Sequence, residues 1–313
     1  MGFLGVGKTT AILQLLADKA RLEKWAVLVN EFGVVGIDGA IYASQGSMVK
    51  EVPGGCMCCA AGVPMQVAVN RLLRDARPDR LLIEPSGLGH PRRVLETLDS
   101  EYFRGVLDLR ASLCLVDPRK LGDSRYCCNE NFVDQIAMAD VLIANKVDLA
   151  DAHALALFGE WAVQSEPAKQ VVAQTVQARL NRAWLDLPRN PHRKARYSHH
   201  HISMPGEQMP DESRSKKAAM HHSDGRFHSC GWVFPGECVF DYSLLYSEIV
   251  HSAPLRLKGV ISTDRGWFLF NYSDGLLTVS RTGPCPESRI ELIHTEDARN
   301  EMEDSLRKCL KPL

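Results

Sequence analysis

The chain has 313 residues, of which 45% are hydrophobic and 24% charged, and its formal net charge is -1. The near-zero charge argues against a nucleic-acid partner or an anionic membrane surface, and no apolar run approaches the roughly 18–20 residues that span a bilayer. The first motif begins at Gly2, so no signal peptide precedes it. We therefore expect a cytoplasmic protein with no nucleic-acid and no membrane partner.

The ten cysteines are unusual for such a chain. In a small secreted protein they would indicate disulfides, but in a long chain without a signal peptide they favour metal binding or free thiols. Cys56, Cys58 and Cys59 are too close together for unstrained disulfides, which again favours thiolate chemistry.

Helices and strands alternate over the first part of the chain. The apolar rhythm predicts helices over Lys8–Leu22 and Gln66–Ala76. Short apolar runs that end in polar residues predict strands over Trp25–Asn30, Arg80–Glu84 and Val141–Asn145. This alternation predicts an α/β fold with a doubly wound, mostly parallel sheet.

A polar segment follows, and strand signals then return. Pro188–Phe227 is rich in Arg, Lys, His, Ser and Pro, which indicates a linker or mobile loop. Beyond it the pattern predicts a small α+β domain with an antiparallel sheet. Its predicted strands are Ser229–Phe234, Leu255–Ser262, Gly266–Tyr272 and Leu276–Arg281, and its predicted helices Tyr242–His251 and Thr295–Leu310. The expected units are thus 1–187, a His-rich linker 188–227, and 228–313.

A phosphate-binding loop opens the chain. Gly2 to Thr9 matches G-x-x-x-x-G-K-S/T at every fixed position. Such a loop wraps backbone N–H groups around the β-phosphate at the positive end of a helix. Lys8 would reach the β- and γ-phosphates, and the Thr9 hydroxyl would bind Mg²⁺. The phosphate-contacting residues are expected to be Gly5, Val6, Gly7, Lys8, Thr9 and Thr10.

The strand that normally precedes such a loop is missing, because only Met1 stands before Gly2. That strand would lie in the middle of the sheet, and its absence leaves backbone groups of two neighbouring strands unpaired. Two explanations stay open: a start further upstream, or a truncated form with impaired nucleotide binding.

A second motif follows the predicted strand Val141–Asn145. Asn145, Lys146 and Asp148 form N-K-x-D. Asp148 can accept hydrogen bonds from guanine N1 and N2, Asn145 can support the loop, and the stem of Lys146 can cover the ring. Adenine would leave the carboxylate unpaired and is therefore disfavoured. A plain surface turn is the alternative.

A third motif, E-x-x-G, ends the strand Arg80–Glu84. Glu84 would hold Mg²⁺ directly or through water, and the Gly87 N–H could face the γ-phosphate. A buried strand that ends in a turn is the alternative.

The cysteine cluster lies between these motifs. Cys56, Cys58 and Cys59 can converge on one soft cation such as Zn²⁺, which binds thiolates at about 2.3 Å. Three thiolates leave a tetrahedral site one ligand short. Buried small hydrophobes or a redox role are the alternatives.

Together these motifs resemble the CobW-type GTPases, relatives of the GTPases that load nickel into urease and hydrogenase. The resemblance covers nearly the whole chain, including a His-rich connector and a small C-terminal domain. It is carried by Gly2–Thr10, Asn30–Gly33, Gly36–Asp38, Gly55–Cys59, Glu84–Pro91 and Asn145–Asp148.

The resemblance implies a GTPase whose cycle is coupled to the binding and delivery of a metal, most often zinc. It also implies that Asp38 lies in or near a switch segment that senses the γ-phosphate and Mg²⁺. Where the family usually carries a metal-binding Glu, this chain has Val34, so the fourth zinc ligand is open, with Glu31 and His90 as candidates.

The expected function is therefore GTP hydrolysis by a slow, metal-modulated metallochaperone that uses GTP, Mg²⁺ and Zn²⁺ and serves an unidentified client metalloprotein. A homodimer is left open. Two rivals remain: a passive zinc-buffering module without hydrolysis, and a GTPase with a redox-sensing cysteine cluster.

The seven histidines between His192 and His228 either capture metal or belong to a solvated linker.

Overall fold

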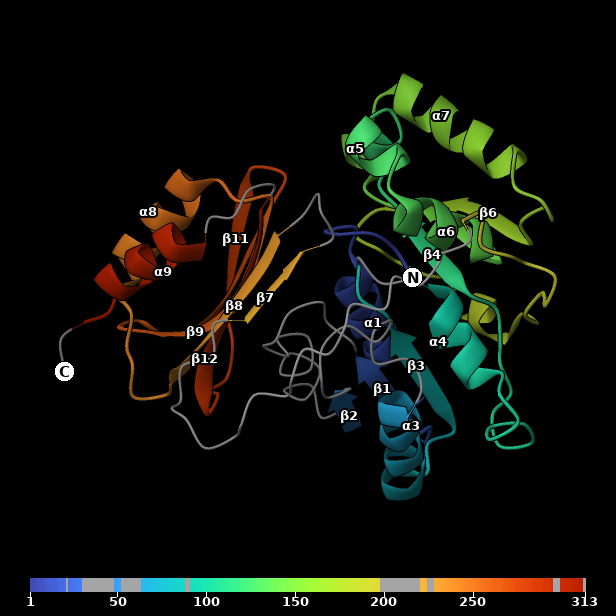
Figure 1. The fold of residues 1–313 in the computed structure, drawn as a ribbon, viewed down its shortest axis with the longest axis horizontal. Coiled ribbons are helices and arrows are strands. Elements are labelled where there is room, and N and C mark those ends of the chain that lie inside the picture. The colour runs from blue at the N-terminus through green and yellow to red at the C-terminus, as the bar shows by residue number, and fades with distance from the viewer. Residues whose placement is uncertain are drawn as a thin grey trace, which may run out of the picture.

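The computed structural model describes residues 1–20, 22–29, 48–51, 63–87, 91–197, 220–223, 228–294 and 299–311. Figure 1 shows the part up to residue 197 on one side and the strands and helices from β7 onward on the other. Within the described residues, no helix combines the length and apolar character needed to cross a bilayer.

The first part alternates helices with parallel strands. Its helices are α1 (Lys8–Ala17), α3 (Val63–Ala76), α4 (Pro91–Leu98), α5 (Ser124–Cys127), α6 (Glu130–Met138) and α7 (Ala152–Val163). Its strands are β1 (Trp25–Val29), β2 (Met48–Glu51), β3 (Arg80–Glu84), β4 (Leu113–Val116), β5 (Val141–Ala144) and β6 (Val171–Gln174). Short 3₁₀ turns are η1 (Pro118–Lys120), η2 (Val147–Leu149) and η3 (Arg182–Asp186).

These strands form two parallel sheets, β2-β1-β3 and β4-β5-β6. Every residue of β1 and β5 is buried, as expected for strands covered on both faces. The α/β class predicted from the sequence is therefore confirmed. Helix α1 is shorter than predicted, because it ends at Ala17 with Asp18 as its C-cap rather than at Leu22.

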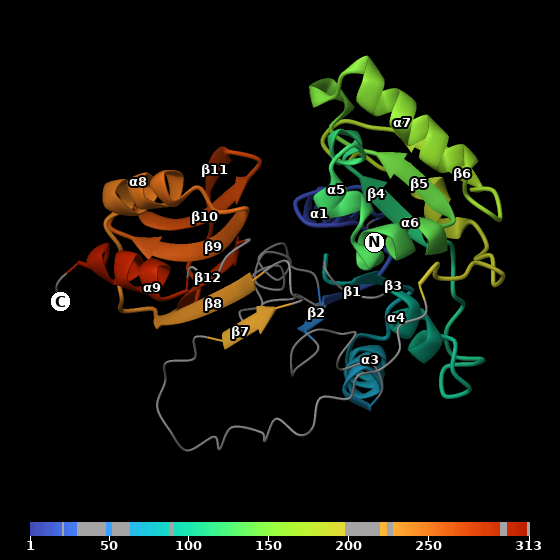
Figure 2. The same ribbon diagram turned by 45° about the horizontal axis from the view of Figure 1, so that its top comes forward.

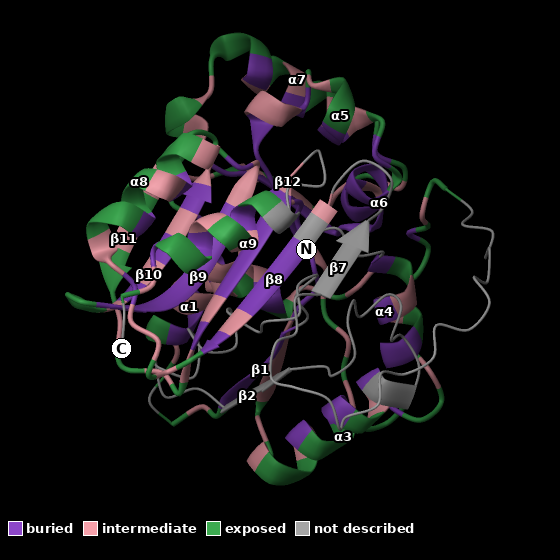
Figure 3. Cartoon of the chain, turned by 60° about the vertical axis from the view of Figure 1, so that its left-hand side comes forward, coloured by how far each residue is buried: buried purple, intermediate pink, exposed green. Residues whose placement is uncertain are grey.

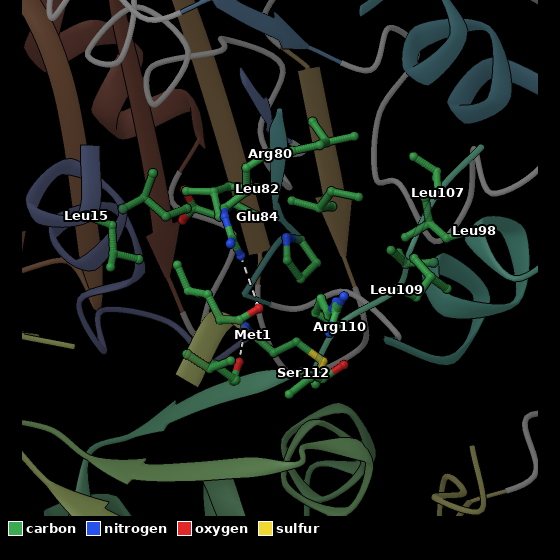
Figure 4. Close-up of a pocket in the computed structure, with 18 of the residues that line it drawn as sticks. Met1, Leu15, Arg80, Leu82, Glu84, Leu98, Leu107, Leu109, Arg110 and Ser112 are labelled. Atoms are coloured by element: carbon green, nitrogen blue, oxygen red, sulfur yellow. Dashed lines mark hydrogen bonds between the residues drawn. The ribbon is translucent and has the colours of Figure 1, made fainter. Parts of the chain in front are cut away.

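Within the described residues, the two parallel sheets do not pair with each other. A cavity of about 540 Å³ separates β3 from β4 and is lined by both strands, α1 and α4 (Figure 4). The first residues of the chain lie beside β4 at this cavity: the Met1 amino group donates to the Leu113 carbonyl at 2.6 Å, and Gly2 pairs in parallel with Leu115.

The last part is an antiparallel sheet with two helices. Its order is β11-β10-β9-β12-β8-β7. The strands are β7 (Met220–Ser223), β8 (His228–Pro235), β9 (Arg256–Thr263), β10 (Gly266–Ser273), β11 (Leu276–Arg281) and β12 (Glu287–His294), and the helices are α8 (Tyr242–Ser252) and α9 (Arg299–Lys308). The predicted α+β unit is thus present, with β12 as a strand that the sequence did not indicate.

One face of this sheet packs on α8 and α9, and the other is turned toward the first part (Figures 1 and 2). The helix side forms an apolar core that includes Trp232, Leu257, Phe270 and Leu306. Figure 3 accordingly shows β8 and β9 mostly in purple, the colour of buried residues. The opposite face carries charged residues, among them Lys258 and Glu291, which stand directly across from each other on β9 and β12.

The segment predicted as a linker, 188–227, is partly structured where it is described. Residues 188–197 pack against the first part, and β7 pairs with β8. The Arg193 guanidinium is buried and donates to Asp140 at 2.8 Å. Those first ten residues are therefore held in place, contrary to a mobile loop.

Candidate nucleotide-binding site

The loop before α1 has the backbone conformation of an anion-binding turn. Gly5 and Gly7 have φ values of 68° and 103°, in the left-handed region that glycine adopts without strain. Helix α1 begins at Lys8, directly after Gly7, and no side chain caps its first N–H groups. These N–H groups and the positive helix end suit a phosphate.

Lys8 is the cation of this loop. Its ammonium donates to the Phe3 carbonyl at 3.2 Å. Burial lowers the pKa of Lys8 to about 8, with Glu84 opposing the shift and Arg256 adding to it. An anion placed beside this ammonium would stabilise its charged form. Thr10, two residues further along α1, is exposed.

Two oxygen ligands lie together beside Lys8. The Thr9 hydroxyl donates to the Glu84 carboxylate at 3.4 Å, and Glu84 is buried at the end of β3. A hydroxyl and a carboxylate at one point suit Mg²⁺, which prefers oxygen ligands and completes its shell with phosphate and water. The residues present therefore fit the Mg²⁺ that the motif implies.

Gly87 lies close to Leu4 and Lys8, and its lack of a side chain has a steric reason. A Cβ there would lie 3.1 Å from the Lys8 ammonium and 2.9 Å from a methyl group of Leu4. The glycine thus lets the backbone after β3 approach the phosphate loop.

The N-K-x-D loop follows β5 and is tied to the phosphate loop. The buried Asn145 amide donates to the Val6 carbonyl at 2.8 Å, and its oxygen accepts the Ala178 N–H at 2.8 Å. Lys146 has a left-handed backbone, and Asp148 is exposed in η2. Asn145 therefore fixes the distance between the two loops.

Three further residues at the site belong to none of the sequence motifs. Asp117 is buried at the end of β4, bound by Arg119 at 2.6 Å and 3.5 Å from the Lys146 ammonium. A short apolar run ending in an acidic residue, Leu113 to Asp117, could have indicated it. Lys258 and Asp274 reach the loops from the last sheet, at 3.2 Å from Thr9 and Lys146 respectively. No local pattern marks either of them.

The predicted zinc residues and the predicted switch residue lie outside the described residues. This holds for Asp38, Cys56, Cys58 and Cys59, and equally for Glu31, Val34 and His90. In the part of the chain that is described, no three His, Cys, Asp or Glu side chains gather in a metal-binding group. The zinc ligands therefore stay a prediction.

Comparison with known proteins decides the family. Residues 1–173 match the CobW/HypB/UreG nucleotide-binding domain. The chain belongs to the CobW/HypB/UreG family. It is 43% identical over 306 residues to the zinc chaperone YeiR of Escherichia coli, a match that covers 95% of this chain and 92% of YeiR. It is 32% identical over 218 residues to the zinc chaperone CobW of Pseudomonas aeruginosa, covering 60% and 56% of the two chains.

The solved structures that match this chain have lower sequence identities. The Zn(II)-bound YjiA GTPase of Escherichia coli is 19% identical with a TM-score of 0.43, and the match covers 99% of this chain and 97% of YjiA. The hydrogenase maturation factor HypB of Archaeoglobus fulgidus is 21% identical with a TM-score of 0.38, covering 56% and 78%.

Proposed function

We propose that this member of the CobW/HypB/UreG family is a GTP-hydrolysing zinc metallochaperone. One observation carries the proposal: the phosphate loop, the Thr9–Glu84 oxygen pair and the N-K-x-D loop meet at one place in the fold, and Asn145 links them. Two relatives are named zinc chaperones, which supports zinc as the cargo.

In this proposal the phosphate loop holds the nucleotide through its backbone. Gly5, Val6, Gly7 and Thr10 offer N–H groups to the phosphates, while the Lys8 ammonium neutralises their charge. Bound Mg²⁺ supplies charge neutralisation at the phosphates, held by the Thr9 hydroxyl and by Glu84 directly or through water. Asp38 senses the γ-phosphate from the switch segment.

Guanine is selected by the loop after β5. Asp148 is exposed in η2 and accepts the two donors of the guanine edge, while the Lys146 stem covers the ring. Asn145 holds this loop to Val6. An adenine nucleotide would leave the Asp148 carboxylate without donors, so GTP is preferred over ATP.

Zinc is the cargo of the cycle and binds to Cys56, Cys58 and Cys59. If GTP strengthens zinc binding, zinc must strengthen GTP binding by the same factor. Hydrolysis then lowers the affinity for zinc and releases it to a client metalloprotein, for which the unit 228–313 is the proposed recognition surface. We expect GTP hydrolysis without a partner to be slow, because the sequence motifs assign no arginine finger and no water-positioning residue.

Hydrolysis tests this proposal directly. Purified protein is assayed for phosphate release from GTP, with ATP as control, with and without one equivalent of Zn²⁺. We expect GTP-specific turnover whose rate changes with Zn²⁺ and loses its zinc response in Cys58→Ser. Cys128→Ser is the matched control, because this cysteine is exposed and belongs to no motif; its zinc response should stay intact.

Each other outcome points elsewhere. Zinc binding without nucleotide binding would favour the passive buffering module. A GTP hydrolysis rate that changes with thiol oxidation, while the zinc content stays constant, would favour the GTPase with a redox-sensing cysteine cluster.

A further inference from the structure

The face of the last sheet that looks toward the phosphate loop is charged and yet buried. Lys258 on β9 and Glu291 on β12 face each other across the ladder and are 5% and 6% exposed. Burial of charged side chains is expensive unless they meet partners. The partner of Lys258 on the first part of the chain shows what this face contacts.

Lys258 reaches the predicted magnesium position. Its ammonium donates to the Thr9 hydroxyl at 3.2 Å, and the same hydroxyl donates to Glu84 at 3.4 Å. An ion held by Thr9 and Glu84 would lie about 2.1 Å from the hydroxyl oxygen. The Lys258 ammonium lies 3.2 Å from that same hydroxyl oxygen, so an ion bound there would meet a charge of its own sign at short range. Lys258 and Mg²⁺ therefore disfavour each other at Thr9.

The turn between β10 and β11 contacts the N-K-x-D loop. Asp274 and Gly275 form a tight two-residue turn with φ values of 55° and 78°. The Asp274 carboxylate lies 3.2 Å from the Lys146 ammonium and 2.7 Å from that of Lys120. Burial opposes the charge of Asp274, but these two cations outweigh it and lower its pKa to about 2. The carboxylate thus holds the lysine that would cover a guanine ring.

Two further contacts complete the docking. The Ser273 hydroxyl lies 2.6 Å from the point where a side chain on Gly5 would begin, directly against the phosphate loop. Ile293 of β12 is 1% exposed and packs in the apolar cluster that contains Phe3. The sheet therefore meets the loops through charge, hydroxyl and apolar contacts together.

We infer that the last sheet competes with the nucleotide for the same site. Lys258 and the β10–β11 turn contact the phosphate loop and the N-K-x-D loop, and Mg²⁺ with a guanine nucleotide displaces them. This inference rests on the proposed nucleotide site. Linkage makes the effect reciprocal, so bound nucleotide frees the charged face for another partner, and whatever binds that face favours nucleotide uptake.

The test compares affinities for a fluorescent GDP, N-methylanthraniloyl-GDP, in the presence of Mg²⁺. The full chain is measured beside Asp274→Ala, Lys258→Met and Asp264→Ala. Asp264 is the matched control, because it also lies in a two-residue turn of the sheet but pairs with Lys311 at 3.0 Å, away from the loops. If the docked state is about tenfold more populated than the undocked state, a variant that cannot dock binds N-methylanthraniloyl-GDP on the order of tenfold more tightly.

The outcomes separate the two proposals. Tighter binding by Asp274→Ala and Lys258→Met, but not by Asp264→Ala, supports the competitor. Equal binding by all four proteins overturns it while the nucleotide site stands. Weaker binding by Lys258→Met would make Lys258 a nucleotide ligand and also overturns it. No binding by any of the four overturns the proposed function and this inference together.

A second measurement needs no variant. Amine acetylation followed by mass spectrometry reads the accessibility of Lys258 in the unmodified chain, with the exposed Lys311 as reference. Addition of GDP and Mg²⁺ should raise labelling of Lys258 relative to Lys311. Unchanged protection of Lys258 at saturating GDP would contradict displacement of the sheet.

Discussion

At the scale of single residues, Lys8 shows how the site is prepared for an anion. Its ammonium is buried against the Phe3 carbonyl, and burial lowers its pKa to about 8. Between this value and the 10.5 of an unperturbed lysine, the unfolded chain binds more protons than the folded one. Lys8 thus destabilises the fold near neutral pH, and this penalty fades as the pH rises. A bound phosphate would offset the penalty.

We predict that nucleotide affinity falls as the pH rises through about 8. Phosphate stabilises the protonated Lys8, so binding above its free pKa must include uptake of a proton, which weakens affinity by up to about tenfold per pH unit. Titration with N-methylanthraniloyl-GDP between about pH 7 and about pH 9 measures the slope. Lys8→Met should bind weakly with a flat profile, and the same slope in this variant would assign the effect to another group.

At the scale of elements, a buried guanidinium helps to hold the segment after η3. Arg193 donates to Asp140 at 2.8 Å and to the carbonyls of Pro167 and Ala168 at 2.7 Å each. Side-chain exposure is 3% for Arg193 and 1% for Asp140. The composition of this polar stretch predicts a linker, because local sequence does not reveal a partner buried on another element.

We predict that Arg193→Met destabilises the fold by about 3 kcal/mol, because it leaves the buried Asp140 charge without its cation. Urea unfolding measures the change. Arg189→Ala is the control: it removes a pair with Asp99 whose carboxylate is 60% exposed, and should cost less than about 1 kcal/mol. Equal losses in both variants would show that the buried pair has no special weight.

At the scale of the whole molecule, the last sheet has two different faces. One forms its own apolar core with α8 and α9, and the other is charged and contacts the phosphate loop. Strand β12 alternates accordingly: Ile290 and Leu292 belong to the core, while Glu291 lies on the charged face. Its mixed composition explains why sequence patterns did not indicate it as a strand.

We predict that Ile293→Ala raises nucleotide affinity on the order of tenfold, because it removes apolar contact from the docked face without touching a charged group of the site. The same fluorescent GDP titration measures it. Leu244→Ala is the control, since Leu244 is an exposed apolar residue of α8. An affinity of Ile293→Ala equal to that of Leu244→Ala would speak against docking as the barrier to binding.

The sequence by itself determined the α/β class, the antiparallel C-terminal sheet, the phosphate loop and the family, because each depends on periodicity or on residues close together in the chain. The approach of Thr9 to Glu84 agrees with the Mg²⁺ that both motifs predict, because Thr9 lies in the first turn of α1 and Glu84 ends β3. Only the tertiary structure decided that Asn145 ties the two loops, that Asp117 lies beside Lys146, and that Lys258 and Asp274 come from the far sheet. Three of these four contacts join residues more than a hundred positions apart. The energy of all four comes from burial and charge pairing that exist only once the chain is folded.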